Sequence, residues 1–293
     1  MLEFTNLTKS FFKRILKKYA PLEVLPLSLF FNPRIKSRIR ELPYKKILIL
    51  APHPDDEAIG MGGTISLQQE KDSRITIIYM TDGRHENPEL GLPQSQMINI
   101  RRQEAQSIGR EYNINQIFWP IEDTNLTNDQ KTVHDLEKLL HDMHPEVVCL
   151  PTFYECHYDH FAANKILADA LKNSKTKINI LAYEVWNNNP FPNIILDISS
   201  NFQKKLEILN HYKIPMKGND YVKLCKNRNS YHYNLYIDNK SDGFAEVFYH
   251  LDSPTYLEMF QDYNYLLHKI GSTLPSEPST RQRGHGLAPE FYG

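Results

Sequence analysis

The stretch KILILAPHPDDEAIGMGG, residues 46–63, indicates the fold class and gathers several polar side chains in one place. Its first six residues form an apolar run that is rich in β-branched side chains, which is typical of a buried strand. The run leads into His53, Asp55 and Asp56, and the glycines at 60–63 mark the expected start of a helix. A strand that passes through a short polar turn into a helix predicts the first unit of an α/β fold.

The same alternation of apolar runs and amphipathic segments continues along the chain. It favours a single main α/β domain with a Rossmann-like, mostly parallel sheet and helices on both faces. In such folds, ligands bind beyond the carboxyl ends of the strands. The expected strands are 46–51, 74–81, 116–120, 146–150 and 178–185, with a late strand at 245–248, and the expected helices are 97–112, 129–144, 161–172 and 201–212.

Composition excludes several classes of protein. The chain has 293 residues, of which 41% are hydrophobic and 24% charged, as in folded proteins with a sizeable core. No stretch approaches the roughly 18 consecutive apolar residues of a membrane span, and charged residues interrupt the first twenty positions where a signal peptide would be apolar. Three cysteines are too few for a disulfide framework, so we expect a cytoplasmic protein.

The N-terminal segment differs in charge from the rest of the chain. Residues 1–46 hold eleven basic and three acidic residues, a balance of +8, whereas the whole chain has a formal net charge of -1. A basic amphipathic helix of this kind can lie on an anionic membrane surface, here the inner one, or can pack its apolar stripe on the main domain. The stripe consists of Phe11, Phe12, Ile15, Leu16 and Tyr19.

Three segments are therefore expected. Residues 1–45 form a basic amphipathic extension, residues 46–275 form the α/β domain, and residues 276–293 form a tail with glycine and proline but no periodic pattern. No nucleic-acid partner is expected, because no known binding motif accompanies the basic residues.

The polar turn after the first strand predicts a metal site. A histidine and two adjacent carboxylates are costly to bury unless a positive charge binds there. His53 and Asp56 can converge on one ion, and Asp55 then points elsewhere as a candidate general base. Dinucleotide binding is the weaker alternative, because the G-x-G-x-x-G spacing is absent and the carboxylates would repel a pyrophosphate.

A second polar cluster follows the strand that ends at Leu150. His157 and His160 are three residues apart where a helix is expected to begin, so both can face the same side. One of them, with His53 and Asp56, completes a His₂Asp set that leaves an open position for water, and spacing alone permits either. Each histidine could instead be a cap or a surface residue, and Cys156 could be a nucleophile or simply a cysteine packed near a metal.

Together, the two clusters resemble a known family. The AHPDDE-type motif at the end of the first strand and the H-x-D-H motif about a hundred residues later resemble the PIG-L/LmbE-type zinc-dependent N-acetylglucosamine deacetylases. The resemblance covers roughly residues 46–250 and implies a Rossmann-like fold with one zinc ion per chain. Further matching elements are Thr81-Asp82-Gly83, Arg101-x-x-Glu104, Glu122-Asp123 and Ala245-Glu246-Val247-Phe248.

The resemblance implies a ligand set and a base. Zinc would be held by His53, Asp56 and His160. Asp55 would be the general base that takes a proton from water.

The resemblance also implies roles for four further residues. His157 would stabilise the oxyanion or protonate the leaving amine, and Asp159 would orient a histidine. Arg101 and Asp123 would contact the sugar.

The function expected from these features is amide hydrolysis. The substrate would be an N-acetylated amino sugar in an N-acetylglucosaminyl-type glycoconjugate or glycolipid, and acetate would be released. One alternative is a zinc amidase that acts on a non-sugar amide or carbamoyl group. Another is a metal-stabilised binding protein without catalysis, although the presence of both Asp55 and His157 argues against it.

Overall fold

The computed structural model describes residues 37–39, 41–189 and 192–269. The predicted amphipathic stripe from Phe11 to Tyr19 lies outside these residues, and so does the predicted tail at 276–293. Both therefore stay predictions.

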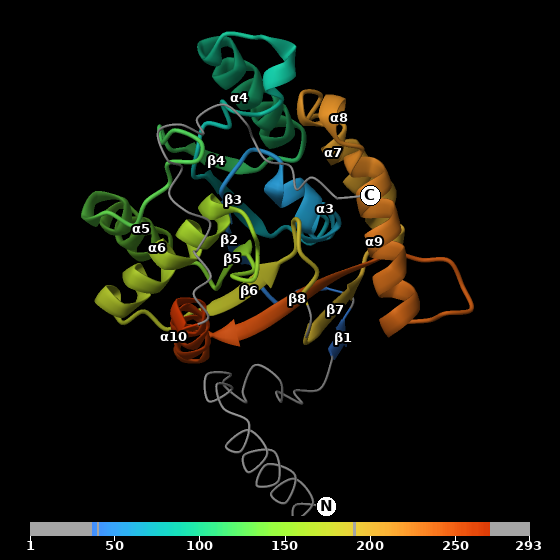
Figure 1. Cartoon of the computed structure of the whole chain (residues 1–293). Helices are drawn as coiled ribbons and strands as arrows, with labels where there is room; N and C mark the ends of the chain where they lie inside the picture. The colour runs from blue at the N-terminus through green and yellow to red at the C-terminus, as the bar shows by residue number, and fades with distance from the viewer. Residues whose placement is uncertain (1–36, 40, 190–191, 270–293) are drawn as a thin grey trace, which may run out of the picture.

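An eight-stranded sheet organises the described part of the chain (Figure 1). The strand order is β1-β7-β8-β6-β5-β2-β3-β4. Among the described strands, β8 pairs antiparallel with β6 and β7, and all other pairings are parallel, which confirms the predicted mostly parallel sheet. The strands are β1 (Ser37–Ile39), β2 (Lys46–Ala51), β3 (Arg74–Tyr79), β4 (Asn115–Phe118), β5 (Val147–Pro151), β6 (Asn179–Tyr183), β7 (Ile194–Asp197) and β8 (Ala245–Asp252).

Helices cover both faces of this sheet, as predicted (Figure 1). On one face lie α3 (Asp56–Gln69), α4 (Gln94–Glu111), α7 (Phe202–Leu209) and α9 (Tyr221–Tyr236), and on the other lie α5 (Gln130–Met143), α6 (Tyr158–Ser174) and α10 (Ser253–Lys269). The short helices are η2 (Pro88–Leu90), η3 (Ser199–Asn201) and α8 (Pro215–Gly218). Across the described residues, no helix has both the length and the hydropathy that a membrane span requires.

The strand order reverses between β2 and β5. On one side of this point the chain continues to β3 and β4, and on the other side to β6. In register, Ile49 of β2 pairs with Ile77 and Cys149, so β2 is buried at the centre of the sheet. The two polar clusters follow β2 and β5, and they therefore meet at the switch point where α/β folds bind ligands.

Parts of the prediction differ from the structure, which also holds strands β1 and β7 and helix α10 that were not predicted. The first helix does not start at the glycines 60–63, because α3 begins at Asp56 inside the polar motif, where carboxylates in the first turn suit the positive end of the helix dipole. The helix α9 was not predicted, because its buried face is largely polar and leaves no apolar stripe to detect. That face consists of Tyr221, Cys225, Arg228, Asn229 and His232.

The turn between β2 and α3 has an unusual backbone conformation at Asp55. Its φ is 132° and its ψ is -23°, a region that residues other than glycine rarely adopt. The Asp55 carbonyl accepts the N–H groups of Ala58 and Ile59 at 2.9 Å, and its own N–H donates to Glu57 Oε2 at 3.2 Å. These bonds on both sides of the residue hold the strained conformation in place.

A buried ion pair fills a break within α3. The helix departs from helical geometry at Met61, where φ is -146°. Lys205 Nζ donates to the carbonyl of Ile59 at 2.8 Å, before the break, and Glu246 Oε1 accepts the N–H of Gly63 at 3.0 Å, after it. The two side chains lie 2.6 Å apart and are fully buried. The pair thus caps both halves of the broken helix and fixes the position of its first turn.

Lys205→Met should destabilise the protein far more than Lys204→Met, its neighbour in α7. Removing Lys205 leaves the Glu246 carboxylate buried without a cation, which costs about 3–5 kcal/mol. Lys204 is 47% exposed and pairs with Glu70, so its loss should cost less than about 1 kcal/mol. Urea unfolding of the two variants measures the difference, and equal stabilities would show that the buried pair does not support α3.

Asp55→Gly should be more stable than Asp55→Ala. Both variants lose the carboxylate, but only glycine adopts the observed φ without strain, a difference of about 1–3 kcal/mol. Lys138, which is exposed in α5, provides the control. Lys138→Gly should be less stable than Lys138→Ala by about 1 kcal/mol, because glycine weakens helix interiors. The same order at both positions, measured by chemical denaturation, would contradict strain at Asp55.

Candidate metal and catalytic site

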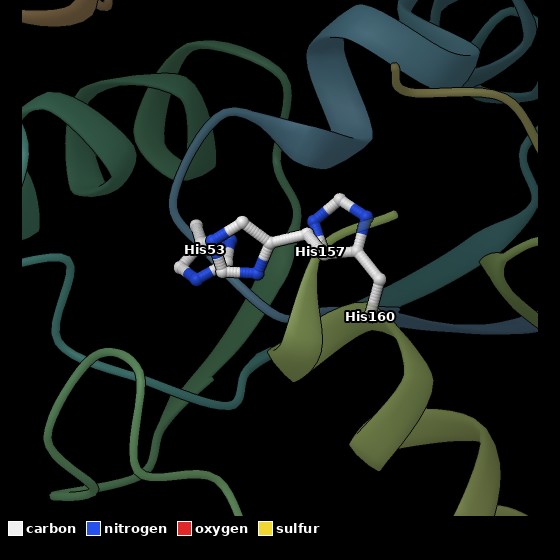
Figure 2. A group of neighbouring side chains, drawn as sticks. All are labelled: His53, His157 and His160. Carbon is white, nitrogen blue, oxygen red and sulfur yellow. The ribbon is translucent and has the colours of Figure 1, made fainter. Parts of the chain in front are cut away.

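Three histidines from the two motifs gather at the first turn of α6 (Figure 2). His53 lies in the turn after β2, His157 is the N-cap of α6, and His160 lies in the first turn of that helix. The ring centroids of His53 and His157 are 4.5 Å apart, and those of His157 and His160 are 5.1 Å apart. The two sequence clusters therefore form one site.

The three predicted metal ligands lie together. Asp56 Oδ2 is 3.3 Å from His53 Nδ1 and 3.2 Å from His160 Nε2. The same oxygen accepts the backbone N–H of His53 at 2.8 Å, which closes the turn. The Asp56 carboxylate thus lies between His53 and His160, and the role of the three residues as metal ligands stays a prediction.

His160 provides a test of whether the site suits a metal ion. The residue is fully buried, and although Asp56 Oδ2 and Glu155 Oε2 lie 3.2 and 3.8 Å from its ring nitrogens, neither nitrogen forms a well-aligned hydrogen bond with a described residue. A buried imidazole without hydrogen bonds is costly, whereas a metal ion would use the lone pair of one nitrogen. Imidazole nitrogen and carboxylate oxygen are also common ligands of divalent transition metals. The residues form a candidate His/Asp metal site.

The geometry alone permits more than one ligand set. The ligand atoms of His53, His157 and His160 all lie within 4.8 Å of one another, and so do those of His53, Asp123 and Asp159. The choice of His160 over His157 therefore stays a prediction from the family resemblance.

Two carboxylates hold the other side of the His53 ring. His53 Nε2 is 3.0 Å from Asp159 Oδ2 and 3.2 Å from Asp123 Oδ1. Asp159 is fixed in turn by the N–H groups of Thr124 and Leu126, at 2.7 and 3.2 Å. A carboxylate behind a metal-binding histidine sets the orientation of its ring. Asp159 and Asp123 both lie beside His53, and the orienting role of Asp159 stays a prediction.

These contacts shift the protonation of the histidines in opposite directions. Burial lowers the pKa of His53, but the carboxylates of Asp123, Asp159 and Asp56 raise it well above its usual value. Burial also lowers the pKa of His160, but Asp56 and Glu155 raise it to about 9. At His157, burial and the two neighbouring histidines outweigh the carboxylates of Asp159 and Asp123 and lower its pKa to about 4.

In a neutral His157 ring, a hydrogen bond shows which nitrogen carries the proton. Its Nδ1 accepts the backbone N–H of Asp159 at 3.2 Å. The proton of the neutral ring must then be on Nε2, which leaves that nitrogen as a hydrogen-bond donor.

The candidate base, Asp55, lies against a buried arginine. Asp55 Oδ2 is 3.1 Å from Arg101 Nη2, which also donates to the carbonyl of Pro54. Burial raises the pKa of Asp55 well above its usual value, and Arg101 offsets part of this rise. Arg101 is fully buried, and its Nε and Nη1 have no hydrogen-bond partner among the described residues. The structure thus places Arg101 against Asp55, and its predicted contact with a sugar stays a prediction.

A buried hydrogen-bond network around Glu57, next to Asp55, was not predicted from the sequence. Glu57 is fully buried and accepts hydrogen bonds from the hydroxyls of Tyr212 and Tyr79, at 2.5 and 3.1 Å. Burial raises its pKa to about 7, although these hydrogen bonds act against the rise. The only signal in the sequence was a third acidic residue in the PDDE run.

Cys156 is exposed, and the pKa of its thiol is raised by partial burial and by Glu155, so it does not suit a thiolate nucleophile.

Comparison with known proteins gives a family match and, among the sequence relatives, two proteins named as deacetylases. Residues 48–171 match the PIG-L family profile, described as GlcNAc-PI de-N-acetylase. A probable N-acetyl-alpha-D-glucosaminyl L-malate deacetylase 2 of Bacillus subtilis (strain 168) is 28% identical over 138 residues, which cover 44% of this chain and 62% of that protein. A diacetylchitobiose deacetylase of Thermococcus kodakarensis is 30% identical over 135 residues, which cover 40% of this chain and 45% of that protein. The chain thus spans less than two thirds of the length of either curated relative.

Solved structures share the fold. The N,N'-diacetylchitobiose deacetylase of Pyrococcus horikoshii has a TM-score of 0.63 and 23% identity, over 73% of this chain and 86% of that one. GalB, the 4-carboxy-2-hydroxymuconate hydratase of Pseudomonas putida KT2440, has a TM-score of 0.60 and 20% identity, over 70% of this chain and 96% of that one. One fold therefore serves different reactions. Residues 48–171 of this chain are thus similar in sequence to the PIG-L family, and the fold agrees with that similarity.

Proposed function

We propose that the chain is a zinc-dependent hydrolase that removes the acetyl group from an N-acetylated amino sugar and releases acetate. The observation that carries this proposal is the meeting of His53, Asp56 and His160 beside the Asp55–Arg101 pair. This arrangement lies within the residues that match the PIG-L family profile, and two curated relatives of the chain are named as deacetylases.

One zinc ion per chain would be held by His53, Asp56 and His160. When bound, it would supply Lewis-acid polarisation of the acetyl carbonyl and lower the pKa of water at the site. His53 would use Nδ1 as ligand, because its Nε2 faces Asp159 and Asp123. The carboxylates on Nε2 would make the imidazole a stronger ligand.

Asp55 would act as the general base. Its carboxylate would take the proton from the attacking water, and Arg101 would hold that carboxylate in place at 3.1 Å. The Asp55 side chain lies against Arg101, and the strained backbone at this residue would help to fix that position.

His157 would act on the carbonyl oxygen or on the leaving amine. As a neutral ring with its proton on Nε2, it can donate a hydrogen bond to the developing oxyanion. Asp159 would set the orientation of both neighbouring rings, because its N–H donates to His157 and its carboxylate faces His53.

The proposed substrate is an N-acetylglucosaminyl-type glycoconjugate or glycolipid. The names of both curated relatives support a sugar substrate, and Arg101 and Asp123 are the proposed sugar contacts. The basic N-terminal segment would bring a glycolipid substrate to the site by binding the inner membrane surface.

Removal of metal should abolish release of acetate. We expect that the full chain, treated with a chelator, releases no acetate from N,N'-diacetylchitobiose, an N-acetylglucosaminyl malate or an N-acetylglucosaminyl phospholipid. Addition of zinc should restore release from at least one of them. Full activity of metal-free protein would overturn the metal dependence, and no acetate from any substrate by zinc-loaded protein would favour a binding protein.

Three single variants should separate metal ligands from catalytic groups. His160→Ala should lose zinc and activity together, because Asp56 and His53 alone hold an ion weakly. His157→Ala and Asp55→Asn should keep zinc and lose about 10²–10⁴-fold in kcat, as general acid–base groups do. His141→Ala, at an 82% exposed position in α5, is the control. Elemental analysis and kinetics of each variant provide the measurement. If only His157→Ala lost zinc, the roles of the two histidines would be the reverse of those proposed.

A further inference from the structure

A buried carboxylate, Glu155, joins the turn before α6 to the loop after β6. Its side chain has no exposed surface. It accepts the backbone N–H of Val185 at 2.8 Å, that of Trp186 at 3.1 Å and that of Asn187 at 3.2 Å. Three successive N–H groups around one carboxylate form a concave anion site, which here is filled by the protein itself. This clamp fixes the loop that follows β6.

The same carboxylate lies behind a proposed metal ligand. Glu155 Oε2 is 3.8 Å from His160 Nδ1, on the side of the ring away from Asp56. That nitrogen has no hydrogen-bond partner among the described residues. A negative charge behind a metal-binding imidazole raises its basicity and fixes its orientation. Glu155 is therefore placed to act on His160 through its charge.

The clamped loop presents an aromatic side chain to α9. Trp186 is partly buried, and its ring centroid is 5.7 Å from that of Tyr221, the first residue of α9. A second bond holds the loop, because Asn187 Nδ2 donates to the carbonyl of Tyr154 at 2.6 Å. The position of Trp186 thus depends on residues 154 and 155, which are separated from the H-x-D-H motif by Cys156 alone.

We propose that Glu155 is a positioning residue that couples the metal ligand His160 to the loop carrying Trp186. Binding of the ion and placement of Trp186 then depend on one carboxylate. The inference rests on the proposed function, because it takes His160 as a metal ligand. A neutral amide cannot replace the carboxylate, since its NH₂ group would face the N–H donors of the loop.

The test is Glu155→Gln in the full chain, in a background with Trp119→Phe. The chain has two tryptophans, so Trp186 is then the sole source of tryptophan emission. Competition with a chromophoric chelator should show zinc binding about 10–100-fold weaker than in the background protein. Emission of the metal-free variant should shift to the red and become more accessible to acrylamide.

A matched control is Glu146→Gln. The Glu146 carboxylate also accepts backbone N–H groups, those of Lys45 at 2.6 Å and Lys46 at 3.3 Å, but at the opposite end of β2. This variant should leave zinc affinity and Trp186 emission unchanged. An equal loss of zinc affinity in Glu146→Gln would overturn the proposal, because the effect would then come from general destabilisation.

Asn187→Ala keeps the proposal testable if Glu155→Gln fails to fold. It removes the bond to Tyr154 and leaves Glu155 intact, so coupling predicts a several-fold loss of zinc affinity together with a changed Trp186 emission. An unchanged zinc affinity or an unchanged Trp186 emission in the folded variants would overturn the coupling. A background protein that binds no zinc would overturn the proposed function and this inference with it, whereas normal zinc binding by Glu155→Gln would overturn the inference alone.

Discussion

The arrangement of the site depends on the contacts that the His53 imidazole makes with three carboxylates. Asp56 approaches its Nδ1, and Asp159 and Asp123 approach its Nε2. These carboxylates come from the turn after β2, the first turn of α6 and the loop after β4. One ring can meet all three because the parallel strands β2, β4 and β5 end at the same edge of the sheet. Any change in the order or register of these strands would separate the groups.

The site is held by buried polar contacts behind it rather than by apolar packing alone. The Lys205–Glu246 pair bridges the break in α3, and Glu57 binds the N–H of the strained residue Asp55. Such contacts are costly to bury and stabilise the fold only when each polar atom is satisfied. Strain at a functional residue persists when its surroundings determine the backbone. The first turn of α3 is therefore positioned by side chains that take no part in the proposed reaction.

The sequence predicted much of the secondary structure and the meeting of the two motifs. It did not predict the other side-chain contacts between distant segments. Its run at 46–51 matches β2 fully, because a continuous apolar run bounded by a polar turn has few other interpretations. The gathering of the two motifs followed from the parallel sheet alone. The pairing of Asp55 with Arg101 could not be predicted, because it depends on how α4 packs beside the turn. The clamp formed by Glu155 likewise joins two loops whose conformations carry no periodic signal.

The proposed site would bind one metal ion between His53 Nδ1, Asp56 and His160 Nε2. Anomalous diffraction from crystals of zinc-loaded protein, collected on both sides of the zinc absorption edge, locates the ion directly. We expect a single peak in contact with these three side chains, with Asp159 and Asp123 still on His53 Nε2. A peak between Asp123 and Asp159, on the other side of the ring, or no peak at all would contradict this account.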